Sequence, residues 1–170
     1  MRCVKIGVGR VSGKRAGVTV NGLSGSTDET DLTDRRKMKI SKIDHIGIAV
    51  KDLKMVARLY SDAFGLKVSD EIDAPGKKLR IAFVEISGTK LEFLMPTDKE
   101  SVVAKFIDKR GEGIHHICFE VDDIEKAVSE LKSKGMEFVD DKPRLGVEGD
   151  KIVFLQPKSV HGVLIELKQK

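Results

Sequence analysis

Two histidine–glutamate pairs recur along the chain with similar spacing. His45 precedes Glu92 by 47 residues, and His116 precedes Glu166 by 50 residues. Imidazole nitrogens and carboxylate oxygens together suit a borderline or hard divalent cation, and four such ligands leave two cis positions of an octahedron open. A substrate that offers two oxygens could chelate there. The ion would act as a Lewis acid and acidify a neighbouring C–H group, with a glutamate as the base.

The two histidines begin similar stretches of sequence. Residues 45–50 (HIGIAV) line up with residues 116–121 (HICFEV) at an offset of 71 positions. Seven residues after each histidine stands an aspartate, Asp52 or Asp123, a good cap for the N-terminus of a helix. Apolar residues then follow the spacing of a helix with one buried face, and a glycine ends each helix. These residues are Leu53, Val56, Ala57, Tyr60 and Gly65 in the first copy, and Ile124, Ala127, Val128, Leu131 and Gly135 in the second.

Each copy continues with segments that are typical of strands. Two apolar-rich runs flank a hairpin turn at residues 87–89, and two later runs are joined by a longer loop that contains Pro157. A helix that begins near Ser101 links the copies. We therefore predict an α+β protein of two tandem βαβββ modules, at about residues 42–96 and 113–168. The expected strand segments are residues 79–86, 90–95, 151–156 and 162–167, and the residues expected to be buried on the linking helix are Val102, Val103, Phe106 and Ile107.

Strand alternation decides which side chains share a face of the sheet. In the first strand His45, Gly47 and Ala49 fall on one face, and the aliphatic residues 46, 48 and 50 fall on the other, which suits packing beneath a helix. The small residues beside His45 leave room for a cavity. Glu92 and Glu166 each stand between two apolar strand residues, so their carboxylates should point away from the face that those neighbours bury.

The other two histidines, His115 and His161, and the cysteine Cys118 have simpler interpretations than metal binding. A lone strand histidine is more often a core or surface group than a ligand, and only the matched pairing with glutamates favours a metal site. Alternation should turn His115 away from His116, so we interpret His115 as a packing residue or as a support for a ligand. His161 belongs to a loop. Cys118 shares the expected cavity face, but a single thiol there is more typical of a small wall residue.

Composition argues against several classes of protein. The 170 residues suit one compact domain, and no apolar run approaches the roughly 20 residues that span a bilayer, so no membrane partner is expected. Residues 1–37 contain eight Lys and Arg against four Asp and Glu, whereas residues 38–170 contain 23 of each. The latter lack the net positive charge typical of nucleic-acid binding. Cys3 and Cys118 form no disulfide framework, so we expect a reducing location, the cytoplasm.

The leading segment, residues 1–37, is rich in Gly, Ser, Thr and charge, and we expect a poorly ordered N-terminal extension ahead of a domain at residues 38–170. A phosphate loop fits badly, because Gly9 and Gly13 enclose three residues instead of four and Arg15 replaces a Ser or Thr. A mitochondrial transit peptide is an alternative, since the first 27 residues contain Arg and Lys but no acid. Met38 could also be the natural start.

Paired βαβββ modules that each supply a histidine and a glutamate resemble the vicinal oxygen chelate superfamily. Within it, residues 40–168 resemble the methylmalonyl-CoA epimerase family. The first matching stretch is common in the superfamily, and the later ones are more specific. These stretches are residues 44–50 (DHIGIAV), 103–117 (VAKFIDKRGEGIHHI), 143–146 (PRLG), 154–158 (FLQPK) and 162–167 (GVLIEL).

The resemblance implies a curved mixed sheet around a metal-binding cavity. It implies His45, Glu92, His116 and Glu166 as ligands of one divalent ion, with cobalt first and nickel, manganese, zinc or magnesium as alternatives; some relatives have Gln at the position of Glu92. The family's reaction is epimerisation at C2 of methylmalonyl-CoA, by proton abstraction and an enediolate that the metal stabilises.

The resemblance also implies acid/base groups on opposite faces of C2, and Glu166 matches one of them. The other, a glutamate in some members, falls around residues 79–81, where this chain has no carboxylate. Glu85 is the nearest one along the strand. The implied partner is a small-molecule acyl-CoA whose phosphates meet lysines at the cavity rim, and the family often forms homodimers.

Three other functions are compatible with the same scaffold. A glyoxalase-type lactoylglutathione lyase would use the same four ligands, although residues 112–116 and 143–146 favour the epimerase. A metal-free module that binds an antibiotic or another ligand would not need all four ligands. An extradiol dioxygenase usually has more modules and a site of three ligands.

Overall fold

The computed structural model describes residues 37–170. The expectations for the leading segment, namely poor order, a phosphate loop or a transit peptide, concern residues that lie outside this range apart from Lys37. Among residues 37–170, no helix is long and apolar enough to cross a membrane.

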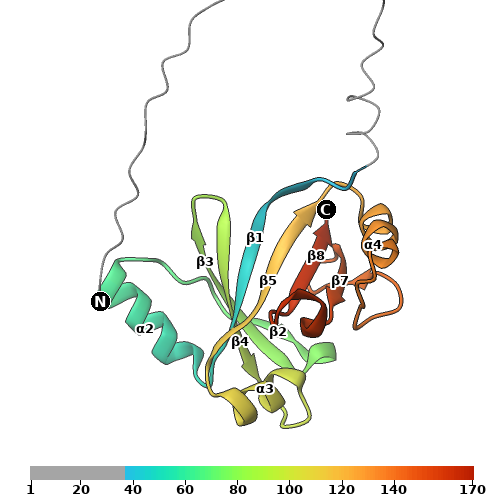
Figure 1. Cartoon of the computed structure of the whole chain (residues 1–170). Coiled ribbons are helices and arrows are strands. Elements are labelled where there is room, and N and C mark those ends of the chain that lie inside the picture. The colour runs from blue at the N-terminus through green and yellow to red at the C-terminus, as the bar shows by residue number, and fades with distance from the viewer. Residues whose placement is uncertain (1–36) are drawn as a thin grey trace, which may run out of the picture.

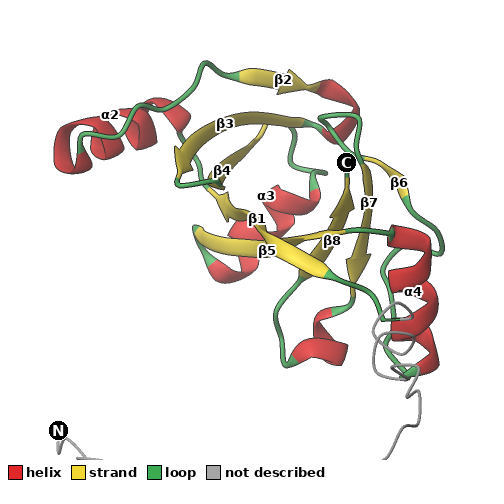
Figure 2. Ribbon diagram, turned by 90° about the horizontal axis from the view of Figure 1, so that it is seen from above, coloured by secondary structure: helices red, strands yellow, loops and turns green. Residues whose placement is uncertain are grey.

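The described residues form one mixed sheet of eight strands in the order β2-β3-β4-β1-β5-β8-β7-β6 (Figure 1). Strands β1 and β5 pair antiparallel at the centre, whereas β1 pairs parallel with β4 and β5 pairs parallel with β8. Seen from above, the sheet curves, with helices α2 and α4 outside the curve and α3 on its inner side (Figure 2). The strands are β1 Ile40–Ala49, β2 Ile72–Ala74, β3 Leu79–Ile86, β4 Thr89–Pro96, β5 Gly113–Val121, β6 Arg144–Leu145, β7 Lys151–Leu155 and β8 Ile165–Gln169.

Each half of the sheet has the predicted order of one strand, one helix and three strands. Helix α2 (Leu53–Phe64) follows β1, helix α4 (Ile124–Ser133) follows β5, and helix α3 (Val102–Arg110) links the halves. The α+β class and the two tandem βαβββ modules are therefore confirmed. The shortest strands, β2 and β6, lie at the two edges of the sheet, where a short strand limits unwanted pairing.

The helix ends follow from the repeat. The side chains of Asp52 and Asp123 accept hydrogen bonds from backbone N–H groups of the first turn of α2 and α4. Gly65 and Gly135 follow these helices with φ of 65° and 79°, in the left-handed region that glycine adopts without Cβ strain. The predicted caps and stop signals are confirmed.

Strand alternation separates the core into an outer and an inner side. Ile48 and Val50 pack in the cluster beneath α2, whereas Ala49 packs with residues of α3 on the inner side. In the second module Ile117 and Phe119 pack in the cluster beneath α4. The helices α2 and α4 therefore cover the aliphatic face, and the face that carries the histidines points into the curve.

Helix α3 differs from its prediction at one residue. Val103 and Ile107 are 1% and 7% exposed, and Phe106 is partly buried, as expected. Val102 is 69% exposed, so the prediction that it is buried is wrong. The i, i+4 pair Val103 and Ile107 faces the sheet, and Val102 and Phe106 lie on the neighbouring face of the helix, because residues one position apart differ by about 100°.

Of the three irregularities in the central pairing of β1 with β5, two lie directly before the predicted histidine ligands. Between the paired positions 43/119 and 45/118, β1 contains one extra residue, Asp44. Between the paired positions 47/116 and 48/114, β5 contains one extra residue, His115. A bulge of this kind can re-aim a side chain out of strict alternation. The two bulged residues are 71 positions apart, so they are equivalent in the repeat.

Candidate metal centre

The four predicted ligands come from the four central strands of the sheet. His45 lies on β1, Glu92 on β4, His116 on β5 and Glu166 on β8. In each module the glutamate pairs in register with the residue two positions after the histidine. The duplicated sequence therefore builds two equivalent half-sites that face each other across the β1–β5 pair.

The structure brings these four side chains into contact. Nε2 of His45 and Nε2 of His116 are 3.0 Å apart. Oε2 of Glu166 lies 3.3 Å from the first nitrogen and 3.0 Å from the second, and Oε2 of Glu92 lies 3.4 Å and 3.7 Å from them. His45, His116 and Glu166 are buried, and Glu92 is partly exposed. One cluster thus contains two imidazole and two carboxylate groups.

The spacing of the donor atoms suits one metal ion. Ligands at about 2.1 Å from an ion and at right angles lie about 3 Å from each other. The distances from 3.0 to 3.7 Å match that separation. The donors of His45, His116 and Glu166 all lie within 4.8 Å of one another. The chain therefore has a group of residues that can hold a divalent ion.

Gly47 makes room for one of the imidazoles. It pairs with His116 across the β1–β5 ladder, and a Cβ atom built on Gly47 would lie only 2.2 Å from Cε1 of that ring. A larger residue would force His116 out of its position. We expected the small residues beside His45 to leave room for a cavity, but at Gly47 the ring of His116 occupies that space.

Without a metal, the site holds opposite charges in contact. Burial alone would lower the pKa of His45, but hydrogen bonding to Glu166 and the charges of Glu92 and Glu166 raise it to about 9. Burial alone would raise the pKa of Glu166, but its contacts with both imidazoles lower it to about 2. Burial raises the pKa of Glu92 against the opposing charges of the two histidines. The two carboxylates therefore favour the protonated form of His45.

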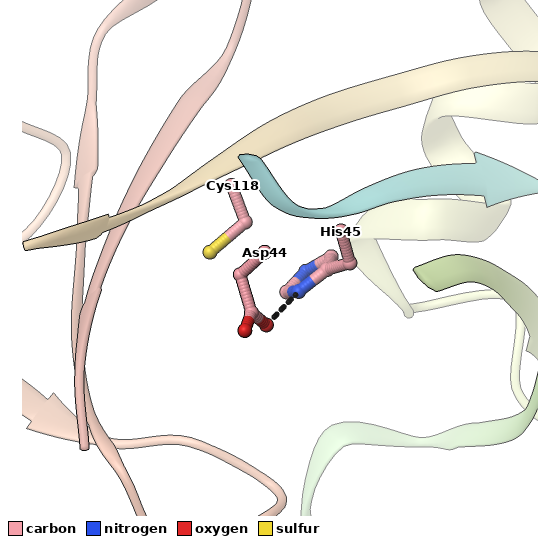
Figure 3. Close-up of side chains that lie close together, drawn as sticks. All are labelled: Asp44, His45 and Cys118. Atoms are coloured by element: carbon pink, nitrogen blue, oxygen red, sulfur yellow. Dashed lines mark hydrogen bonds and ion pairs between the residues drawn. The ribbon is translucent and has the colours of Figure 1, made fainter. Parts of the chain in front are cut away.

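The carboxylate of Asp44 supports His45 through the ring nitrogen Nδ1. Nδ1 of His45 lies 3.1 Å from Oδ2 of Asp44, so the ring can donate a hydrogen bond there and leave Nε2 for the metal (Figure 3). Nζ of Lys168 donates to the same carboxylate oxygen at 3.2 Å and also pairs with Glu148 and Asp150. Burial would raise the pKa of Asp44, but the contacts with His45 and Lys168 lower it to about 2.

Neither Asp44 nor Lys168 was identified as a site residue from the sequence. The side chain of Lys168 is only 4% exposed, although lysine is among the residues that are rarely buried. A signal did exist, because Lys168 stands two positions after Glu166 and period-two alternation places both on one face of β8. Asp44 could not be found in this way, because only the bulge brings it to the side of His45.

Cys118 lies beside Asp44 and His45, and donor atoms of the three residues fall within 4.8 Å of one another (Figure 3). The thiol is completely buried, and burial raises its pKa, so it stays protonated. Asp44 is already paired with Lys168. We therefore interpret these residues as the packed support of His45, and Cys118 as a wall residue.

His115 corrects one expectation. Alternation predicted that it would turn away from His116, yet the two Nδ1 atoms are 2.9 Å apart. The bulge at His115 re-aims its ring toward the cavity, so it supports a ligand instead of turning away. Its counterpart in the repeat, 71 positions earlier, is Asp44. Burial and the neighbouring charge of His116 lower the pKa of His115 to about 4, so it is neutral. His161 follows the short helix η2 (Pro157–Val160) in a loop, as predicted.

The four groups border a cavity of about 170 Å³ inside the curve of the sheet. Glu85 does not line it, so the carboxylate nearest to the expected second acid/base position is not at the cavity. Leu79 and Ile81 form part of the apolar wall instead. The further ionisable groups on the wall are Lys77, His115, Arg144, Glu148, Asp150 and Lys168.

The chain is similar to known proteins of one superfamily. Residues 44–154 match the model of the glyoxalase/bleomycin resistance protein/dioxygenase superfamily. The human mitochondrial methylmalonyl-CoA epimerase is 34% identical over 163 residues, which cover 95% of this chain and 93% of that protein. The chain belongs to the methylmalonyl-CoA epimerase family.

Solved structures of methylmalonyl-CoA epimerases share the fold. The enzyme from Mycobacterium tuberculosis is 35% identical, with a TM-score of 0.71 over 76% of this chain and 88% of that one. An epimerase solved in complex with methylmalonyl-CoA and NH4+ is 36% identical, with a TM-score of 0.72 over 78% of this chain and 96% of that one. The curved mixed sheet implied by the resemblance is thereby confirmed.

Proposed function

We propose that this protein interconverts the C2 epimers of methylmalonyl-CoA with the help of one divalent metal ion held by His45, Glu92, His116 and Glu166. The observation that carries the proposal is the contact of Glu166 with both imidazoles at the wall of a cavity, in a chain of the epimerase family. Cobalt is the ion that the family resemblance favours. The ion, when bound, supplies a Lewis acid that lowers the energy of negative charge on a substrate oxygen.

The protein's own residues would divide the remaining work. Glu166 is ionised, so its carboxylate can accept the proton from C2 and return it, and a carboxylate has two oxygens with which to hold an ion and move a proton. Asp44 and His115 hold the two imidazoles in orientation. The apolar wall that includes Leu79 and Ile81 limits water around the reacting carbon.

Epimerisation also needs a proton carrier on the opposite face of C2. Glu85 is not at the cavity, and residues 79–81 contain no carboxylate. We propose that the second carrier is one of the other ionisable groups of the cavity wall, the set that includes Lys77 and His115.

The test is exchange of the C2 proton. The metal-loaded protein, incubated with methylmalonyl-CoA in deuterated water, should incorporate deuterium at C2, as measured by mass spectrometry, and a chelator should abolish the exchange. His116→Ala and Glu166→Ala should lose both bound metal and exchange. His161→Asn is the matched control, because His161 lies in a loop with φ of 55°, which asparagine tolerates.

Two outcomes would contradict the proposal. Exchange that persists in the Glu166→Ala variant would remove that residue from the mechanism. Turnover of methylglyoxal with glutathione, without exchange on methylmalonyl-CoA, would favour the lactoylglutathione lyase. The homodimer and the location, in the cytoplasm or in mitochondria, stay predictions that sedimentation and cell fractionation can check.

A further inference from the structure

The ammonium group of Lys168 is buried among three carboxylates. Its Nζ atom lies 3.2 Å from Oδ2 of Asp44, 2.5 Å from Oε2 of Glu148 and 3.0 Å from Oδ2 of Asp150. An ammonium group has three donors, so each carboxylate can accept one hydrogen bond from it. These contacts join three separate parts of the chain, namely β8, the bulge in β1 and the loop between β6 and β7.

Two of the three carboxylates belong to the loop at residues 146–150, which we call the β6–β7 loop. The N–H group of Gly146 donates a hydrogen bond to the carbonyl oxygen of Asp150 at 2.8 Å, and this contact closes the loop. Gly146, Val147, Glu148 and Asp150 all line the cavity that the four proposed ligands border. The β6–β7 loop is therefore part of the wall that faces a bound substrate.

Glu148 also connects the β6–β7 loop to the other half of the sheet. In the strand order, β4 is separated from β7 and β6 by β1, β5 and β8. Even so, Oε1 of Glu148 lies 2.7 Å from Nζ of Lys90 on β4. Lys90 stands two positions before Glu92, and Lys168 stands two positions after Glu166. The loop is therefore attached to both strands that carry the glutamate ligands.

Asp44 lies between cations on two sides. Its Oδ2 atom lies 3.1 Å from Nδ1 of His45 and 3.2 Å from Nζ of Lys168. Its Oδ1 atom lies 3.7 Å from Nζ of Lys42 and 3.8 Å from Nζ of Lys170. The side chains of Lys42 and Lys170 are 37% and 59% exposed, so water weakens their attraction. Lys168 draws the carboxylate inward to His45, and the other two lysines draw it outward.

We propose that Lys168 is a positioning residue that couples the β6–β7 loop to the metal site. It holds the carboxylate of Asp44 against His45, and it holds Glu148 and Asp150 in the wall of the cavity. This inference rests on the proposed function for its metal ion and its substrate. The competing explanation is that Lys168 only neutralises buried carboxylates and so stabilises the fold.

The first test follows the hydrogen bond between His45 and Asp44 in the metal-free protein. In Lys168→Met the NMR signal of the Nδ1 proton of His45 should shift, because the carboxylate is free to turn toward the outer lysines. Metal affinity, measured by chelator competition, should fall about tenfold, as expected for a displaced support of a ligand. The matched control is Lys170→Met, which removes the same charge on the outer side of Asp44 and should change neither the signal nor the affinity.

Two further variants separate the effect on the loop from the effect on Asp44. Glu148→Gln weakens only the hold on the β6–β7 loop, so KM for methylmalonyl-CoA should rise about threefold, while kcat and metal affinity stay within about twofold of the wild type. In an Asp44→Ala background, Lys168→Met should lower metal affinity by less than about a further twofold, because no carboxylate is left to be held against His45.

Two results would overturn the proposal. The first is an equal loss of metal affinity on Lys168→Met with and without Asp44, and the second is a lower unfolding temperature with an unchanged NMR signal of His45. If Lys168→Met alone does not fold, the triple variant Lys168→Met/Glu148→Gln/Asp150→Asn removes the lysine together with the loop charges and permits the same measurements.

Failure of the proposed function has a different signature. The wild type would then bind no divalent ion or exchange no C2 proton of methylmalonyl-CoA. The NMR signal of His45 in the metal-free protein would still report whether Lys168 positions Asp44, so the two failures are distinguishable.

Discussion

The two halves of the proposed metal site have the same arrangement but different supporting residues. His45 in the first module rests on the buried carboxylate of Asp44, which Lys168 neutralises. His116 in the second module rests on a neutral imidazole, His115. Both supporting residues occupy the bulge directly before a ligand, at equivalent positions of the repeat. Duplication therefore preserved the geometry of the site while the chemistry of each half diverged.

The residue two positions after each histidine also differs. Gly47 in the first module leaves space for the ring of His116, and Cys118 in the second module fills the space beside His45 with a buried thiol. In the first module, the absence of a side chain at Gly47 accommodates the ring of His116. In the second module, the side chain of Cys118 packs beside the ring of His45. The two ligands should respond differently to the same kind of substitution.

The largest effect should come from Gly47→Ala. The new Cβ would lie 2.2 Å from Cε1 of His116, so the ring must leave its position, and an overpacked core typically costs about 1–3 kcal/mol as well. We expect metal affinity to fall about 100-fold or more, because displaced support alone reduces affinity by about 10–100-fold. Competitive titration against a chelator measures the loss.

Cys118→Ala is the matched control at the equivalent position. It removes a thiol that lies outside the ligand set, so metal affinity should stay close to that of the wild type. Equal losses in the two variants would show that the halves respond alike, and the contrast between an accommodated and a packed imidazole would be wrong.

The repeat explains how much of this molecule the sequence predicts. Matched histidines, aspartate caps and terminal glycines predicted both modules, and period-two alternation predicted that four side chains would share the inner face. Alternation failed at Asp44 and His115, because one extra residue in a strand has no signature in the pattern of apolar residues. The residues that support His45 and His116 were therefore missed, although the four proposed ligands lie close together as predicted.

Lys168 shows a second limit of sequence reasoning. Its position on the face of Glu166 was readable, but its three carboxylate partners come from β1 and from the loop before β7. A buried lysine is tolerable only with such partners. No local pattern indicates a contact between residues 124 positions apart, so the sequence did not identify this lysine as buried.

Substitution of the two supporting residues, Asp44 and His115, should lower metal affinity by intermediate amounts that differ between the two. Asp44→Ala removes a charged hydrogen-bond acceptor from His45, so metal affinity should fall about 10–100-fold. His115→Leu removes a neutral acceptor from His116, and neutral hydrogen bonds are about half as strong as charged ones, so the loss should be about 3–10-fold. Chelator competition on both variants compares the halves directly.

Conservative variants distinguish a loss of metal affinity from a loss of folding stability. Asp44→Asn and His115→Gln retain an acceptor, so each should recover part of the affinity lost in Asp44→Ala or His115→Leu, with similar unfolding temperatures within each pair. Equal losses for Asp44→Ala and His115→Leu would mean that charge is not what distinguishes the two supports.

The smallest effect concerns the proton on His45. In the metal-free protein its pKa is raised from 6.5 to about 9, so this proton stabilises the fold fully below pH 6.5, and the stabilisation is lost as pH rises through 9. A metal ion must displace the same proton, so apparent metal affinity should rise about tenfold per pH unit up to pH 9 and then level off.

The stability of the metal-free protein and its metal affinity should change in opposite directions with pH, so the prediction can be contradicted by either measurement. Between pH 6.5 and 9 the free energy of unfolding of the metal-free protein should fall while metal affinity rises. Asp44→Ala should lower the pH at which both curves bend, because the Asp44 carboxylate helps to hold the proton on His45. His115→Leu should not shift the bend in this way, since His115 contacts only His116 among the four ligands. If Asp44→Ala and His115→Leu shift the pH of the bend by the same amount, the whole cluster of four residues holds the proton, and not His45 with Asp44 alone.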